Sequence, residues 1–159
     1  MSLRILGRDR ILTPEYELLE REGGRPAKPA ERILLLHYLA CERPVVETGS
    51  LLPFRDFSGG MFYEDAFQAR SVKPLVGAIG NDLARLERNL GRFDWERQAL
   101  GDVSARIHAF GNIRMTLVYQ VGDDEFGPSA DVFFDACARH AIGTEDAAVL
   151  ASRICLGLL

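Results

Sequence analysis

Short apolar runs near both ends of the chain predict paired antiparallel strands. Residues 3–6 and 10–12 flank the turn Gly7-Arg8-Asp9, a pattern typical of a β-hairpin. Residues 113–121 form the clearest strand pattern of the chain, and residues 130–134 follow as the return strand. The segment between these two strands is rich in glycine and acidic residues, which indicates a turn. We therefore expect a hairpin toward each end of the chain.

Helical patterns occupy the middle and the end of the chain. Residues 30–41 follow Pro29, which is favoured at the start of a helix, and they are apolar on every side. Because such a helix is usually buried, we expect it to be the central core helix. Residues 63–70 and 81–90 predict shorter helices, and Thr144 is expected to cap a C-terminal helix.

The order of these elements predicts the fold class. Strands and helices do not alternate strictly, which disfavours a doubly wound parallel sheet. We expect an α+β fold with a mainly antiparallel sheet, a buried central helix and a C-terminal helix. With 159 residues and no linker or internal repeat, the chain is expected to form a single domain, residues 1–159.

The composition is that of an average soluble protein, with 47% hydrophobic and 26% charged residues. It excludes a disordered chain, a collagen-like repeat and a disulfide-stapled miniprotein. The longest apolar stretch, residues 33–41, is far shorter than the ~20 residues that cross a bilayer. The N-terminus also lacks the apolar core of a signal peptide. We therefore expect a cytoplasmic protein with no membrane partner.

Charge is distributed unevenly along the chain. The net charge is −4, whereas nucleic-acid binders usually carry an excess of positive charge, so no nucleic-acid partner is expected. Residues 1–80 hold 11 basic and 11 acidic residues, whereas residues 115–150 hold only Arg139 against seven acids. Two interpretations of this acidic window stay open. Either it faces a cation or a basic partner, or its acids belong to turns and helix N-termini, which favour them on local grounds.

The three cysteines, Cys41, Cys137 and Cys155, show no C-x-x-C spacing. An odd number without that spacing argues against a disulfide framework or a zinc ribbon. Buried free thiols in a reducing compartment are therefore the expectation.

Several short motifs occur together in a fixed order. They are Leu36-His37-Tyr38-Leu39, then Phe54-Arg55-Asp56-Phe57-Ser58-Gly59-Gly60 with Tyr63, then Gly122-Asp123-Asp124-Glu125-Phe126 with Phe134-Asp135. In this order and spacing they resemble, over roughly residues 30–155, an uncharacterised prokaryotic family common in anaerobes, a domain of unknown function. The resemblance implies an association with iron–sulfur modules or with corrinoid and one-carbon enzymes, but it implies no mechanism. Because the chain lacks clustered cysteines, the resemblance does not imply that it binds an iron–sulfur cluster.

The loop from Arg55 to Gly60 is the first candidate binding site. Gly59 and Gly60 allow a turn whose N–H groups cradle an anion, and a helix beginning near Tyr63 would add donors. Arg55 can bind a phosphate or a carboxylate through two hydrogen bonds. These features predict a binding or accessory domain for a small anionic ligand, or for the acid groups of a cofactor of unknown identity. The alternative is a structural turn in which Arg55 pairs with a carboxylate of Asp56 or of the acidic loop.

Asp124 and Glu125 of the acidic turn are assigned to the same ligand-binding site, because a pairing with Arg55 would unite the two loops. A metal-assisted enzyme is an alternative, in which Asp123, Asp124, Glu125 and His37 act on a bound cation. The turn departs from the EF-hand pattern, however, and neither metal ligands nor catalytic residues are assigned. A third alternative is a structural interaction domain or a homodimer with an apolar contact surface.

Overall fold

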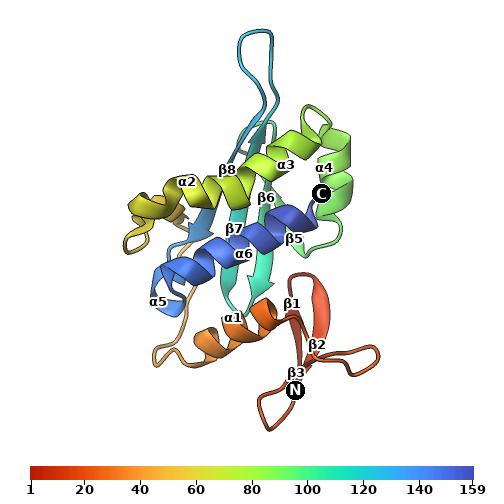
Figure 1. Ribbon diagram of the computed structural model, residues 1–159, viewed down its shortest axis with the longest axis vertical. Helices are drawn as coiled ribbons and strands as arrows, with labels where there is room; N and C mark the ends of the chain where they lie inside the picture. Colours follow the sequence, from red (N-terminus) through yellow and green to blue (C-terminus); the bar gives the residue numbers. More distant parts are fainter.

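The computed structural model describes residues 1–159 and has an α+β fold, which confirms the expected fold class. A small three-stranded sheet lies at one end of the molecule, and a five-stranded sheet forms its centre (Figure 1). Every strand pair in both sheets is antiparallel. Helices cover one face of the central sheet.

The small sheet has the strand order β1-β2-β3, with β1 at Ser2–Ile5, β2 at Arg8–Leu12 and β3 at Leu18–Glu20. The predicted N-terminal hairpin is confirmed as β1 and β2. The N–H of Leu6 donates to the carbonyl oxygen of Ala109 in the central sheet at 2.7 Å. This bond ties the β1–β2 turn of the small sheet to the end of β6 in the central sheet.

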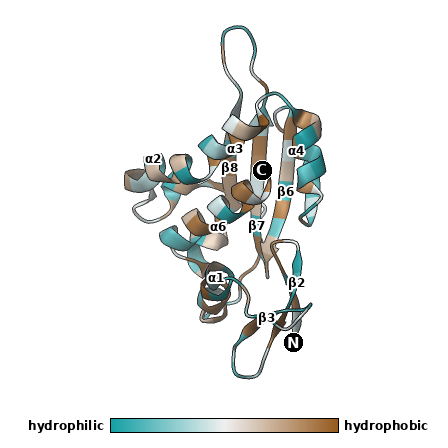
Figure 2. Ribbon diagram, turned by 45° about the vertical axis from the view of Figure 1, so that its right-hand side comes forward, coloured by the Kyte–Doolittle hydropathy of each residue, from teal (hydrophilic) through white to brown (hydrophobic).

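The central sheet has the strand order β4-β8-β7-β6-β5. Its strands are β4 (Leu51–Pro53), β5 (Trp95–Gln98), β6 (Val103–Phe110), β7 (Ile113–Gln120) and β8 (Ser129–Asp135). Along β7, the side chains of Ile113, Met115, Leu117 and Tyr119 are buried and alternate with polar or less buried residues, except that Thr116 is also buried. Figure 2 shows hydrophobic residues concentrated along β7 and β8. The strands predicted from the apolar pattern near the C-terminal end are therefore confirmed.

The helices follow one another around the central sheet. They are α1 (Pro29–Leu39), the 3-10 helix η1 (Phe54–Asp56), α2 (Gly60–Arg70), α3 (Val72–Ile79), α4 (Leu83–Leu90), α5 (Ala138–Ala141) and α6 (Thr144–Gly157). The helices α2, α3 and α6 cross one face of the sheet (Figure 1). None of the helices is long and apolar enough to span a lipid bilayer.

The most buried helix is α6 rather than α1. In α6 the side chains of Leu150, Ile154 and Cys155 are fully buried. The assignment of the central core position to residues 30–41 is wrong, because Ile33 and Leu36 of α1 are 50% and 43% exposed. The helix α1 packs against α6 through one side only, near the small sheet. The predicted C-terminal helix therefore takes the central position.

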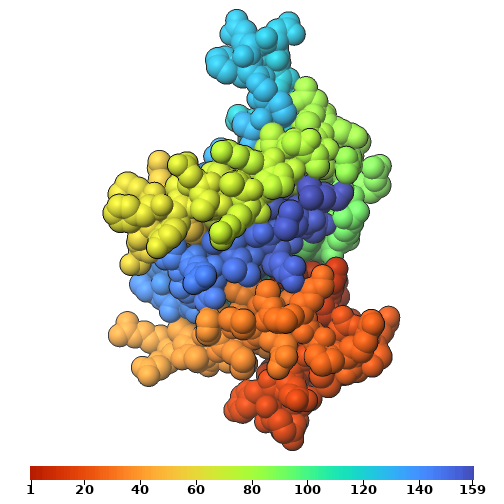
Figure 3. Space-filling view, in the orientation of Figure 1, coloured from red at the N-terminus to blue at the C-terminus, as the bar shows by residue number.

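The turn between β7 and β8 extends beyond the end of the central sheet as a projecting hairpin. The space-filling view shows it standing clear of the rest of the molecule (Figure 3). Phe126 at its tip is 72% exposed. The acidic turn is therefore a surface feature, away from the packed core.

Candidate functional site

The Arg55–Gly60 loop forms a tight turn between η1 and α2. The N–H of Gly60 donates to the carbonyl oxygen of Phe57 at 2.8 Å, so this donor is not free for an anion. A Cβ atom at Gly60 would lie 2.3 Å from the carbonyl oxygen of Phe54, and Gly59 has a φ of +71°. Both glycines are thus accounted for by the turn itself. Arg55 is exposed and forms no ion pair.

Tyr63 lies in the first turns of α2, as predicted, and is 64% exposed. It lines a cavity of about 360 Å³ between α2 and the start of α6, together with Phe54, Phe67 and Arg70. Arg55 is not part of this lining. The tyrosine and the arginine of the predicted site therefore do not meet in one cavity.

The acidic turn lies apart from the Arg55 loop. The turn sits at the tip of the projecting hairpin, whereas η1 and the start of α2 lie at the side of the molecule (Figure 1). Asp123 closes the turn, because its Oδ1 accepts hydrogen bonds from the N–H groups of Glu125 and Phe126 at 2.8 Å each. These two bonds lower the pKa of the Asp123 carboxyl. The structure does not bring Asp124 and Glu125 to the Arg55 loop.

The residues of the metal-assisted alternative are also dispersed. The Nδ1 of His37 lies 2.7 Å from Oδ2 of Asp146 at the start of α6. The helix α1, which carries His37, and the projecting hairpin with the acidic turn lie at opposite ends of the molecule (Figure 1). Nowhere in the structure do three or more histidine, cysteine, aspartate or glutamate side chains converge as a metal-binding group. The geometry therefore gives this alternative no particular support.

The cysteines are free thiols, and two of them are buried as expected. Burial raises the pKa of Cys155 to about 12. Burial, followed by the neighbouring Asp135 carboxylate, raises the pKa of Cys137 to about 12. Both thiols are thus protonated at neutral pH, which makes them poor nucleophiles.

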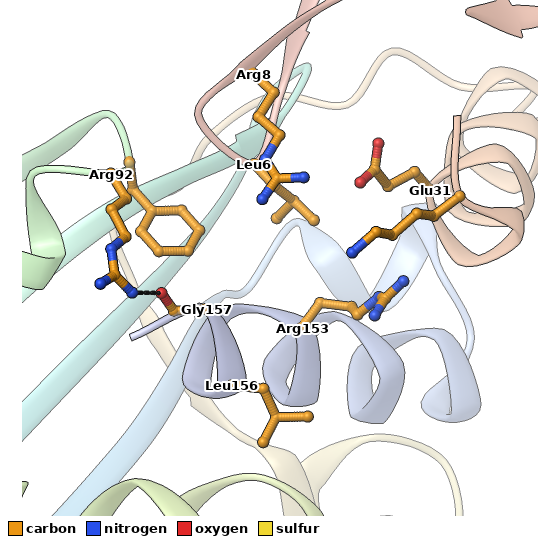
Figure 4. Close-up of a pocket in the computed structure, with 9 residues that line it drawn as sticks. Leu6, Arg8, Glu31, Arg92, Arg153, Leu156 and Gly157 are labelled. Atoms are coloured by element: carbon orange, nitrogen blue, oxygen red, sulfur yellow. Dashed lines mark hydrogen bonds between the residues drawn. The ribbon is translucent and has the colours of Figure 1, made fainter. Parts of the chain in front are cut away.

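A different cavity gathers positive charge. It has a volume of about 450 Å³ and lies between the β1–β2 turn, the start of α1 and the end of α6 (Figure 4). Four cationic side chains line it, those of Arg8, Lys28, Arg92 and Arg153. None of the four forms an ion pair with a carboxylate. We call this the basic cavity; its other lining residues are Leu6, Glu31, Phe93, Leu156 and Gly157.

Each cation of the basic cavity comes from a different part of the fold. Arg8 begins β2, Lys28 immediately precedes α1, Arg92 follows α4, and Arg153 belongs to α6. Gly7 allows the β1–β2 turn to approach the segment after α4. Its φ is +73°, and a Cβ atom there would lie 2.3 Å from the carbonyl oxygen of Arg92. This close approach brings the turn that carries Arg8 to the segment that carries Arg92.

Arg92 also closes the C-terminal end of α6. Its Nη1 donates to the carbonyl oxygen of Gly157 at 2.9 Å, the bond drawn dashed in Figure 4. The last carbonyl groups of a helix lack partners within the helix, and a cationic side chain stabilises them. Arg92 is thereby fixed in place, and it offsets the negative end of the helix dipole at the cavity.

The one carboxylate of the basic cavity is already neutralised. Glu31 is 3% exposed, and its Oε2 accepts a hydrogen bond from Nε of Arg10 at 2.8 Å. Arg10 is 4% exposed, so the two form a buried ion pair behind the cavity wall. The four remaining cations are therefore left without a carboxylate partner in the chain. A low-dielectric wall lined by one sign of charge attracts ions of the other sign.

Little in the sequence indicates this cavity. Its cations lie at positions 8, 28, 92 and 153, so no local spacing connects them. The turn Gly7-Arg8-Asp9 belongs to a recognisable pattern, but that pattern indicates a hairpin rather than a binding site. The tertiary fold alone brings the four positions together.

The fold and the cavity together define a class of protein, an α+β protein with a basic cavity between the β1–β2 turn, the start of α1 and the end of α6. The model of a family described as Domain of unknown function (DUF3786) matches residues 1–156, and the chain belongs to this family. The expected membership of a family of unknown function is thereby confirmed, and the match includes all four cations of the basic cavity. No curated protein and no solved structure matches the chain.

Proposed function

We propose that the protein binds a small anionic ligand in the basic cavity. The observation that carries this proposal is the convergence of four unpaired cations in a chain whose net charge is −4. Arginine side chains bind phosphate and carboxylate groups through paired, charge-assisted hydrogen bonds. The volume of about 450 Å³ is in the range of small-molecule sites.

The ligand class is the one expected from the sequence, but the geometry favours a different place for it. Arg55, Gly59 and Gly60 remain a predicted anion site, although one N–H of that loop is already bonded within the turn. In the basic cavity, by contrast, four side chains from separate elements share one space. The proposal therefore rests on Arg8, Lys28, Arg92 and Arg153.

The two sites are separated by a thermal-shift titration with pyrophosphate. We expect pyrophosphate to raise the melting temperature of the wild type, because a ligand that binds only the folded state stabilises it. Arg153→Gln is expected to lose most of this rise, whereas Arg55→Gln, which changes an exposed arginine outside the cavity, is expected to keep it. The opposite ranking of the two variants, or no rise in the wild type, overturns the proposal.

A second candidate function is association through the start of α2. Met61 and Phe62 are 71% and 85% exposed on adjacent positions of this helix, which favours the interaction-domain or homodimer alternative. Sedimentation velocity of the wild type and of a Phe62→Ser variant tests it. A wild type that is monomeric at all accessible concentrations counts against a homodimer.

A further inference from the structure

We infer that the ligand of the basic cavity is a nucleotide: a phosphoryl group joined through a hydroxyl-bearing sugar to a flat ring. This inference rests on the proposed function and makes its ligand specific. It follows from the mixed chemistry around the cavity, in which cations, one acceptor oxygen and an aromatic ring line the same space.

The phosphoryl group is assigned to the side where the cations gather. Figure 4 shows the guanidinium group of Arg153 on the side of the cavity near α1 and that of Arg8 between this side and Arg92. Lys28, immediately before α1, lines the cavity as well. Arg92 already donates to the carbonyl oxygen of Gly157 and so has fewer donors to offer. Arg8, Lys28 and Arg153 are therefore the phosphoryl-binding group.

The hydroxyl-bearing part is assigned to Glu31. Only its Oε2 is engaged, by Arg10, and its other oxygen has no hydrogen bond within the chain although the residue is 3% exposed. Figure 4 shows this carboxylate directed into the cavity on the same side as Arg8. The second oxygen of this carboxylate can accept a hydrogen bond, which a hydroxyl group donates and a fully ionised group does not. Carboxylates bind ribose hydroxyl groups in this way in dinucleotide sites.

The flat ring is assigned to Phe93. This residue lines the basic cavity and also the neighbouring cavity around Trp95 and His108, so its side chain borders both cavities. The edge of its ring is turned to Gly157, where an added Cβ atom would lie 2.7 Å from Cζ. Leu6 adds an apolar contact in the same cavity. An inorganic anion would leave this apolar wall without a partner, whereas a nucleobase stacks on an aromatic side chain.

The test compares ligands that share the phosphate and the sugar but differ in the ring. Affinities of AMP, GMP, CMP and UMP are measured by isothermal titration calorimetry against ribose 5-phosphate, with pyrophosphate as the probe of anion binding alone. At least one nucleotide is expected to bind about tenfold more tightly than ribose 5-phosphate, the size of effect that one stacked base supplies.

Two variants locate the ring. Phe93→Leu keeps an apolar side chain but removes the aromatic face, and it should abolish the preference for the nucleotide while leaving pyrophosphate affinity within about twofold of the wild type. Phe126→Leu removes a 72% exposed ring from the projecting hairpin and is the matched control, expected to bind as the wild type does. Retained pyrophosphate binding shows that the Phe93→Leu protein is folded.

The outcomes distinguish this inference from the proposed function. If pyrophosphate and ribose 5-phosphate bind but no nucleotide binds more tightly, the nucleotide inference is overturned and anion binding stands. If Phe93→Leu keeps the full preference, the inference is overturned as well, because the base does not contact this ring. If none of the phosphate compounds binds the wild type, the proposed function and the inference fail together.

Discussion

A buried ion pair, Glu31 with Arg10, joins α1 to β2 behind the basic cavity. Both side chains are almost fully buried, so the loss of one charge leaves the other without compensation. Glu31→Gln is therefore expected to lower the free energy of unfolding by about 3 kcal/mol. Urea denaturation at pH 7 measures this change. Glu125→Gln, on the exposed hairpin tip, is the control and should change stability by less than about 0.5 kcal/mol; a similar small effect for Glu31→Gln would contradict the account.

Asp135 fastens the segment before β4 to the end of β8. Its carboxylate accepts hydrogen bonds from the N–H groups of Thr48, Gly49 and Cys137 at distances from 2.7 to 3.1 Å. Burial acts to raise the pKa of Asp135, but the bonds from Cys137 and Thr48 outweigh it and hold the pKa well below its usual range. The ionised form is therefore the one that the folded state favours.

This shift has a defined effect on stability against pH. A carboxyl whose pKa is lowered by folding contributes stability above its unfolded pKa of about 3.9, and this contribution is lost as the pH falls toward the folded value. The wild type should therefore lose stability between about pH 5 and pH 2 more steeply than Asp135→Asn, which should itself be less stable at pH 7 by about 2 kcal/mol. Thermal denaturation across this range measures both. Parallel pH profiles for the two proteins would show that Asp135 does not titrate abnormally.

Gly7 is the residue on which the shape of the basic cavity depends most directly. An alanine at this position meets the carbonyl oxygen of Arg92 and would hold an unfavourable positive φ. Gly7→Ala is expected to cost about 2 kcal/mol of stability and to weaken pyrophosphate binding, because the β1–β2 turn must move away from the segment after α4. Gly24→Ala is the matched control, since Gly24 also has a positive φ but has open space around it. Equal pyrophosphate affinity in the two variants would contradict the role given to Gly7.

At the residue scale the sequence singled out acids and glycines that make structural contacts within the fold. Asp123 closes its own turn, Asp135 holds a neighbouring segment, and Gly60 permits a tight approach to Phe54. These residue types are selected by backbone geometry as often as by ligands, and a sequence does not separate the two causes. The acidic window follows its local interpretation at Asp123, whereas Asp135 binds Thr48 and Gly49, which are distant in the chain.

At the scale of elements, α1 shows that a continuous apolar pattern does not decide which side of a helix is buried. Leu34 is 1% exposed and Ile33 is 50% exposed, although both belong to the same run of apolar residues. Leu34→Ala is therefore expected to cost about 3 kcal/mol, and Ile33→Ala less than about 1 kcal/mol. Chemical denaturation of the two variants checks this. Equal losses would restore the fully buried helix that the sequence predicted.

The strands divide into those that the sequence predicts and those that it misses. The buried alternation of β7 identifies it from hydrophobicity alone, because one face of the strand meets the core. The edge strand β5 reads Trp-Glu-Arg-Gln and is mostly exposed, so its pairing with β6 rather than its side chains defines it. The short strand β3 also pairs with β2, but its Leu18 is buried in the core. Strands held mainly by backbone pairing leave little trace in a hydrophobic pattern.

At the scale of the whole molecule, the basic cavity exists only where distant segments meet. The β1–β2 turn, the start of α1, the segment after α4 and the end of α6 each supply one cation. Sequence reasoning raised the hypothesis of an anionic ligand from a glycine loop and an arginine, but it had no means of pairing Arg8 with Arg153. The projecting hairpin and the Arg55 loop, which do carry recognisable motifs, lie at other places on the molecule (Figure 1).

The most direct test of anion binding at the basic cavity is a crystal structure of the protein with bound tungstate, a phosphate-like oxyanion. Anomalous scattering from tungsten locates the ion without reference to the protein coordinates. We predict the strongest anomalous peak within hydrogen-bond distance of Arg8, Lys28 and Arg153. A strongest peak at Arg55 and Gly59, or no peak in the basic cavity at a saturating concentration, would contradict the account.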